Sequence, residues 1–124
     1  MSLTGWCLCD HGDIDAANPL SAIQRGLVSA DPKVRERSAD EVTDIHQHLI
    51  QADAVVLGWL LTGLRAQEND EDTAESQSHA LAELAEWHDL PSSVVALAIE
   101  PPRALPWQAS ELEYIAYLQS LVTR

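Results

Sequence analysis

The stretch Asp53–Gln67, DAVVLGWLLTGLRAQ, constrains the fold of this 124-residue chain more than any other. A helix over it carries large apolar side chains on more than one side of its cylinder, so other helices must cover it. We therefore expect a central helix without a solvent face and with Trp59 in the core. The apolar part is about half as long as a bilayer span, so no membrane helix is expected. Its large apolar residues are Val55, Val56, Leu57, Trp59, Leu60, Leu61 and Leu64.

Start and stop signals predict further helices around the central one. Asp31-Pro32 places a capping residue before a proline, which favours the first turn of a helix. Ser110 and Glu113 have the spacing of a capping box ahead of a C-terminal helix. Alternation typical of strands does not occur over a useful length, so the expected fold class is all-α. The expected helices are 19–29, 32–50, 53–67, a fourth that ends near residue 89, 91–99 and one that follows Ser110.

The same signals describe one domain over residues 1–124, since a chain of this length supports a single core. Residues 1–17 contain glycines and aspartates without helical periodicity and are expected to form an irregular arm. Residues 100–124 contain three prolines before the last helix and are expected to form a connector and a capping helix.

The first long helix and the fourth have similar patterns. An offset of 39 residues, from Asp31 to Asp70, aligns Val42 with Leu81 and Ile45 with Leu84. A period near 40 residues is typical of the HEAT class of helical repeats. The segment 31–42, DPKVRERSADEV, also resembles the D-P-x-V-R pattern of the first helix in HEAT-like repeats.

The resemblance covers residues 19–99 and implies a short right-handed α-solenoid of about six helices. It would contain two HEAT-like hairpins, which pair helix 32–50 with 53–67 and the fourth helix with 91–99, plus a half repeat and the capping helix. The second repeat departs from the pattern, with Thr73 and Ala74 where valine and arginine are expected. HEAT-like proteins share no chemistry, so the resemblance implies a scaffold that presents a surface. Small bacterial proteins of this type resemble immunity proteins that neutralise a secreted toxin.

The charge of the chain is strongly one-sided. Asp and Glu number 20 against 7 Lys and Arg, and the net charge is −13. Such a chain repels nucleic acid and associates faster with a basic protein. The N-terminus MSLTGWCLCDHGD lacks the basic and apolar regions of a signal peptide, so a cytoplasmic location is expected.

Candidate chemistry is weak along the whole chain. Cys7, Cys9 and His11 could offer metal ligands, but their spacing is unlike that of structural zinc sites and no later cysteine exists. No nucleophile elbow or phosphate loop occurs. We expect no enzyme activity, no cofactor and no metal. Acidic residues and a histidine share one face of the fourth helix, which is interpreted as a solvated face: Glu75, His79, Glu83 and Glu86.

The candidate partner-binding residues are acidic clusters on two helices and one tryptophan. In a HEAT-like stack the first helices of successive repeats lie side by side, so the clusters would meet on one face. Trp107 lies in an irregular segment and either anchors a partner or clamps the proline-rich connector. The predicted acidic residues are Asp40, Glu41, Asp44, Glu68, Asp70, Glu71, Asp72 and Glu75.

The function expected from these residues is the binding of a basic partner by a non-catalytic protein. The main hypothesis is an immunity protein that blocks the cleft of a nuclease-like toxin. The alternative is a scaffold that oligomerises or docks through its solenoid surface, and the expected state is a monomer or weak dimer. Acidity that only keeps the protein dissolved remains a further interpretation.

Overall fold

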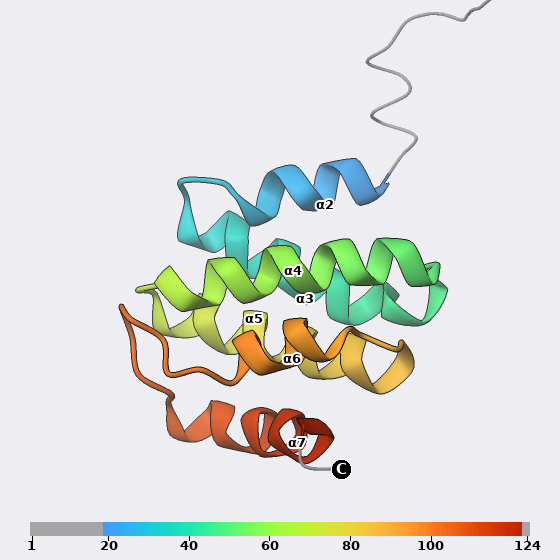
Figure 1. The fold of residues 1–124 in the computed structure, drawn as a ribbon. Helices are drawn as coiled ribbons and strands as arrows, with labels where there is room; N and C mark the ends of the chain where they lie inside the picture. The colour runs from blue at the N-terminus through green and yellow to red at the C-terminus, as the bar shows by residue number, and fades with distance from the viewer. Residues whose placement is uncertain (1–18, 123–124) are drawn as a thin grey trace, which may run out of the picture.

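In the computed structural model, residues 19–122 are described and form an all-helical chain without a strand, as the sequence predicted (Figure 1). The expected arm, with Cys7, Cys9 and His11, lies outside the described residues. The long elements are joined by short connections, except for residues 99–108 before the last helix. The helices are α2 (Pro19–Leu27), α3 (Pro32–Ile45), α4 (Gln51–Gln67), α5 (Glu71–Trp87), α6 (Ser92–Ala98) and α7 (Leu112–Val122), with 3-10 turns η1 (His46–His48) and η2 (Ala109–Glu111).

The helices form two layers. In Figure 1, α2, α4 and α6 lie toward the viewer, α3 and α5 lie behind them, and α7 lies at the lower end. Helices within a layer run in the same direction, and the two layers run in opposite directions. The closest packing joins α3 with α5, α2 with α3 and α4 with α5, while α7 packs against both α5 and α6.

The helix pairing differs from the expected hairpins. Close packing joins α2 to α3 and α4 to α5, whereas the repeat pattern predicted α3 with α4 and α5 with α6. The reason lies at the connections. Asp31 and Asp70 end tight turns that fold α3 back on α2 and α5 back on α4. Side chains of α3 and α4 still meet in the core, where Val42 and Leu57 belong to one cluster.

Capping side chains set two of the helix starts, of which the cap at Asp31 was predicted. The Asp31 carboxylate accepts a hydrogen bond from the Lys33 N–H at 3.0 Å, and Asp70 accepts one from the Thr73 N–H at 3.0 Å. The helix expected at 53–67 begins two residues earlier, at Gln51, so Asp53 lies in its first turn. A carboxylate in a first turn still favours the helix through the free N–H groups there.

Two helix ends also differ from the prediction. The helix expected at 32–50 stops at Ile45 and tightens into η1, where the His46 ring bonds back to the Thr43 carbonyl. The capping box before α7 is formed by Gln108 and Glu111 rather than by Ser110 and Glu113. The reason is that Glu111 is held in the interior by partners described below.

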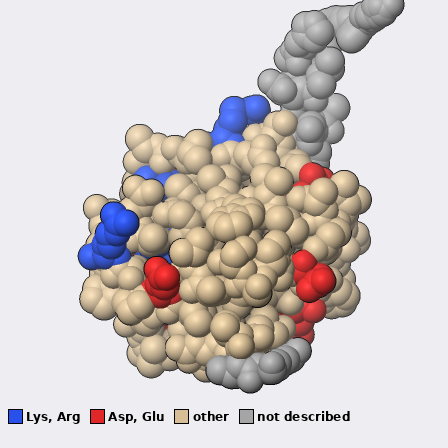
Figure 2. All heavy atoms as spheres, viewed as in Figure 1, with Lys and Arg blue, Asp and Glu red and all other residues tan. Residues whose placement is uncertain are grey.

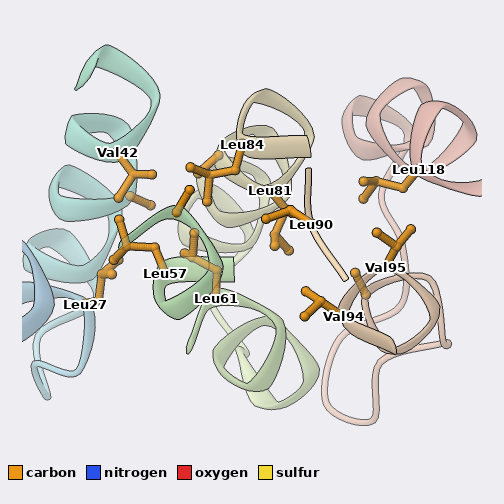
Figure 3. Packing of buried hydrophobic residues seen from close by; sticks show 14 of the residues in the cluster. Leu27, Val42, Leu57, Leu61, Leu81, Leu84, Leu90, Val94, Val95 and Leu118 are labelled. Carbon is orange, nitrogen blue, oxygen red and sulfur yellow. The ribbon is translucent and has the colours of Figure 1, made fainter. Parts of the chain in front are cut away.

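Aliphatic side chains from every helix form one continuous core (Figure 3). Leu57 and Leu61 of α4 are completely buried at its centre. The opposite side of α4 faces solvent, and Trp59 is 44% exposed there. The prediction that the central helix has no solvent face is therefore wrong, and Trp59 is not a core residue. Trp87 at the end of α5 is likewise 54% exposed.

Among residues 19–122, none of the helices combines the length and the hydrophobicity that crossing a bilayer would require.

Candidate protein-binding surfaces

A buried ion pair joins the C-terminal part of the chain to the central helix. Arg65 of α4 is 2% exposed and Glu111 of η2 is fully buried. Nε of Arg65 lies 2.7 Å from Oε1 of Glu111, and Nη2 lies 2.9 Å from Oε2, so the guanidinium donates to both carboxylate oxygens. The Ser78 hydroxyl of α5 donates to Oε1 at 2.6 Å. Three elements distant in sequence are thus joined by one carboxylate.

The connector before α7 closes over this pair. The Trp107 ring lies 4.8 Å from the Arg65 guanidinium carbon, and Nη2 of Arg65 donates to the Leu105 carbonyl at 3.1 Å. The Gln108 N–H donates to Oε2 of Glu111 at 3.0 Å. Trp107 is half-buried and packs against the core cluster. These contacts support the interpretation that Trp107 clamps the connector, and they disfavour a role as a partner anchor.

A second ion pair removes one residue from the predicted acidic surface. Glu68 is 4% exposed, and its carboxylate accepts from Nε and Nη2 of Arg35 at 2.9 and 2.8 Å. Gln77 and the Asp70 N–H donate to the same carboxylate, each at 3.1 Å. Glu68 was predicted to bind a partner, and the structure places it in the interior between α3 and α5. Its role is to neutralise Arg35.

Both buried carboxylates remain ionised because of their partners. Burial raises the pKa of Glu111, but the bonds from Arg65, Ser78 and Gln108 outweigh that effect and hold the pKa below its usual value. Burial likewise raises the pKa of Glu68, and the bonds from Arg35 and the Asp70 N–H more than compensate. Each carboxylate therefore contributes stability in its charged form.

These lowered pKa values predict a loss of stability in acid. A carboxylate with a lowered pKa in the folded state stabilises the fold above the ordinary pKa of 4.5 and loses this contribution as the pH falls below it. We expect the melting temperature, followed by circular dichroism, to drop as the pH falls below 4.5 and through the lowered pKa values of the folded state. Glu111→Gln should flatten that dependence, and an equal slope in parent and variant would contradict the assignment.

The remaining predicted acidic residues lie on α3 and α5, which pack side by side. Thr73 donates its hydroxyl to the Pro32 carbonyl at 2.9 Å, which sets the start of α5 beside the start of α3. Asp70 is half-buried because it caps α5. The exposed predicted residues are Asp40, Glu41 and Asp44 on α3 and Glu71 and Asp72 on α5, with Glu75 half-buried.

The relative position of α3 and α5 keeps the two predicted acidic clusters apart. It also adds carboxylates that were not predicted to the same surface. Glu71 and Asp72 lie at the start of the layer, where Lys33 approaches Asp72 at 3.9 Å, and Asp44 lies near the opposite end. At that opposite end, Nε2 of His88 lies 2.7 Å from the His46 carbonyl oxygen, so the end of α5 lies beside the end of α3. We define the acidic layer as the surface carboxylates of these helices: Glu36, Asp40, Glu41, Asp44, Glu71, Asp72, Glu75, Glu83 and Glu86.

The opposite layer differs sharply in charge. Figure 2 views the side of α2, α4 and α6 and shows few charged atoms, most of them toward the edges. Between Gln51 and Gln67 at its two ends, the solvent-exposed positions of α4 recur at helical spacing and are apolar or small. Such a surface is unusual on a chain with a net charge of −13. The sequence pattern did not indicate this surface, because it predicted Trp59 in the core. We call this set the α4 stripe: Ala52, Val56, Trp59, Gly63 and Ala66.

Two hollows in the surface lie beside α7. The larger, about 530 Å³, lies where α5, α6 and α7 meet, with Leu90 and Tyr117 in its wall. In the smaller, His79 stacks on Tyr114 with ring centroids 4.7 Å apart. Within residues 19–122, no three His, Cys, Asp or Glu side chains are grouped so that they could hold a metal ion.

No protein-family model, curated protein or solved structure matches the chain.

Proposed function

We propose that this chain is a non-catalytic protein-binding module whose acidic layer recognises a basic protein, as the immunity component of a bacterial toxin pair acting in the cytoplasm. The observation that carries the proposal is the side-by-side packing of α3 and α5, because it joins their carboxylates into one surface. A rigid acidic surface can cover the basic cleft with which a nuclease holds phosphates.

The charge balance of the acidic layer supports a cationic partner. Lys33 and Arg37 are the exposed basic residues of α3 and α5, while Arg35 is neutralised by Glu68. The layer therefore keeps a large negative excess that attracts a basic surface from a distance. The same excess repels nucleic acid, so a polyphosphate chain is disfavoured as the ligand.

The architecture that fits this role is a short right-handed α-solenoid of the HEAT type. Its support is the repetition of layers, in which helices of one layer run in the same direction and the successive helices α3 and α5 are neighbours. In such a stack the helices of one layer form an extended surface whose shape is fixed by the core. Rigid presentation lowers the ordering cost of binding, which favours a tight inhibitory complex.

A charge-matched pair of variants tests the proposal. The probes are basic nuclease domains of bacterial toxins, with association followed by surface plasmon resonance between 50 and 300 mM NaCl. The layer variant Asp40→Ser/Glu41→Ser/Asp44→Ser removes three carboxylates from α3. We expect its association rate to fall about tenfold at 50 mM NaCl and to depend less on salt than the parent.

The control variant Asp53→Ser/Asp89→Ser/Glu100→Ser removes the same charge from positions outside the acidic layer. It should associate almost as fast as the parent. Equal rate losses in the two variants would show that net charge alone acts, and unchanged rates in the layer variant would exclude α3 from the binding surface.

An assembly or scaffold protein is the second candidate function. The observation that favours it is the α4 stripe, because a neutral, apolar surface is suited to contact with protein. The two functions use opposite layers and do not compete for residues.

A further inference from the structure

A groove adjoins the α4 stripe. Its volume is about 240 Å³, and α4, α6 and the following connector supply its walls. Thr62 in its wall is 8% exposed, and its hydroxyl oxygen is screened from solvent. The groove is therefore accessible through its exposed apolar and small side chains. The other walls are Trp59, Gly63, Ala66, Leu97, Glu100, Pro101 and Arg103.

The middle of the stripe combines a large side chain with an open position. Trp59 is 44% exposed, and a side chain added at Gly63 would meet nothing within 4 Å. Trp59 and Gly63 are four residues apart and therefore lie on the same side of α4. A protruding ring beside an open position is self-complementary, because each can occupy the other's place in a second molecule.

We propose that the α4 stripe is the contact surface of a twofold homodimer, in which two copies of α4 pack antiparallel. The twofold axis crosses α4 at the level of residue 61, halfway between Trp59 and Gly63. Trp59 of one copy then lies against the open position at Gly63 of the other, and Val56 lies against Ala66. Both copies use the same residues, as a twofold interface requires.

Charge selects a second copy of this chain as the occupant. Two molecules of net charge −13 repel each other through their acidic layers, so self-contact needs a surface where like charges do not meet. The α4 stripe is such a surface. At its rim lie one carboxylate, Glu100, and one guanidinium, Arg103, which forms no ion pair within residues 19–122. The Arg103 N–H donates to the Ala66 carbonyl at 3.0 Å, so both charges lie at the Ala66 end of the stripe, and an antiparallel contact keeps them apart from the same charges of the other copy.

The size of the surface sets the strength of the dimer. The helix α4 has 17 residues and is about 25 Å long, and two adjacent helices present a face about 20 Å wide. Roughly 500 Å² per copy lies at the weak end of specific interfaces. We expect a dissociation constant of about 10–100 μM.

Sedimentation velocity from 2 to 300 μM protein tests the dimer at 50 and 500 mM NaCl. The parent should convert from monomer to dimer with concentration. Salt should tighten the dimer about tenfold, because it screens the repulsion between acidic layers while the contact itself is apolar. Binding of a basic protein to the acidic layer responds to salt in the opposite sense, so failure of one proposal is distinguishable from failure of the other.

Two variants locate the contact. Trp59→Ala removes the protruding ring, and Gly63→Gln fills the open position without adding charge. Each should raise the dissociation constant at least tenfold, while the far-ultraviolet circular dichroism spectrum stays that of the parent. The matched control is Leu112→Ala, which removes an apolar side chain that is 54% exposed on α7 and should leave the dimer unchanged.

Three results would overturn the proposal. The first is a monomer at 300 μM in 500 mM NaCl. The second is a dimer that forms equally well in Gly63→Gln and the parent. The third is growth beyond the dimer, since a twofold contact closes after two copies.

Discussion

Replacing Glu111 with alanine should lower the free energy of unfolding by about 3–5 kcal/mol, because it leaves Arg65 as an uncompensated buried charge. The guanidinium loses both carboxylate contacts, at 2.7 and 2.9 Å, and it has no other anion in the network described here. Ser78 loses its acceptor as well. The backbone N–H of Gln108 loses the bond that closes the capping box at the start of η2 and α7.

Urea unfolding followed by circular dichroism measures this loss. Glu113→Ala is the matched control, since Glu113 is exposed two residues further on, and it should change the stability by about 0.5 kcal/mol or less. The double variant Arg65→Leu/Glu111→Leu should recover much of the loss, because it removes both charges together. The assignment fails if Glu111→Ala is as mild as Glu113→Ala.

Truncation of Leu57 to alanine should cost about 2–5 kcal/mol, whereas truncation of Trp59 should cost about 1 kcal/mol or less. The order is the reverse of what side-chain size suggests. Leu57 is fully buried in the core between α3 and α4, so its removal leaves a cavity. Trp59 is 44% exposed and its removal opens no enclosed space.

Both variants are compared by urea unfolding at about 2 μM protein. At this concentration a dimer with a dissociation constant of about 10–100 μM is mostly dissociated. Similar slopes of free energy against urea would confirm that the two native states expose similar surface on unfolding. If Trp59→Ala proved as destabilising as Leu57→Ala, the outward side of α4 would have to be buried.

Helix positions were predictable because their signals are local. Asp31-Pro32 marked the start of α3, and the repeat offset that aligned Asp70 with Asp31 matches two aspartates that both cap helices. The orientation of α4 was not predictable in the same way. A helix that is apolar on both sides contains no pattern that distinguishes the core from an uncharged surface, and the exposed positions include the largest residue, Trp59.

The buried ion pairs could not be inferred from sequence spacing. Arg65 and Glu111 are 46 residues apart, and no local rule connects them. Glu68 stands in an acidic run with Asp70, Glu71 and Asp72, and composition alone treats these residues alike. Only the register between α3 and α5 selects Glu68 for the interior, by placing Arg35 and Gln77 on either side of its carboxylate.

The antiparallel directions of the two layers have an electrostatic consequence for the molecule as a whole. Ends of α3 and α5 with free N–H groups meet ends of α2 and α4 with free carbonyls at the same edge, so their partial charges largely cancel there. The charged side chains, by contrast, gather on the layer of α3 and α5. The permanent dipole moment of the described chain is therefore directed across the layers and not along the helices. In the field of a basic surface this moment exerts a torque that turns the layer of α3 and α5 toward that surface before contact, and the α4 stripe away from it.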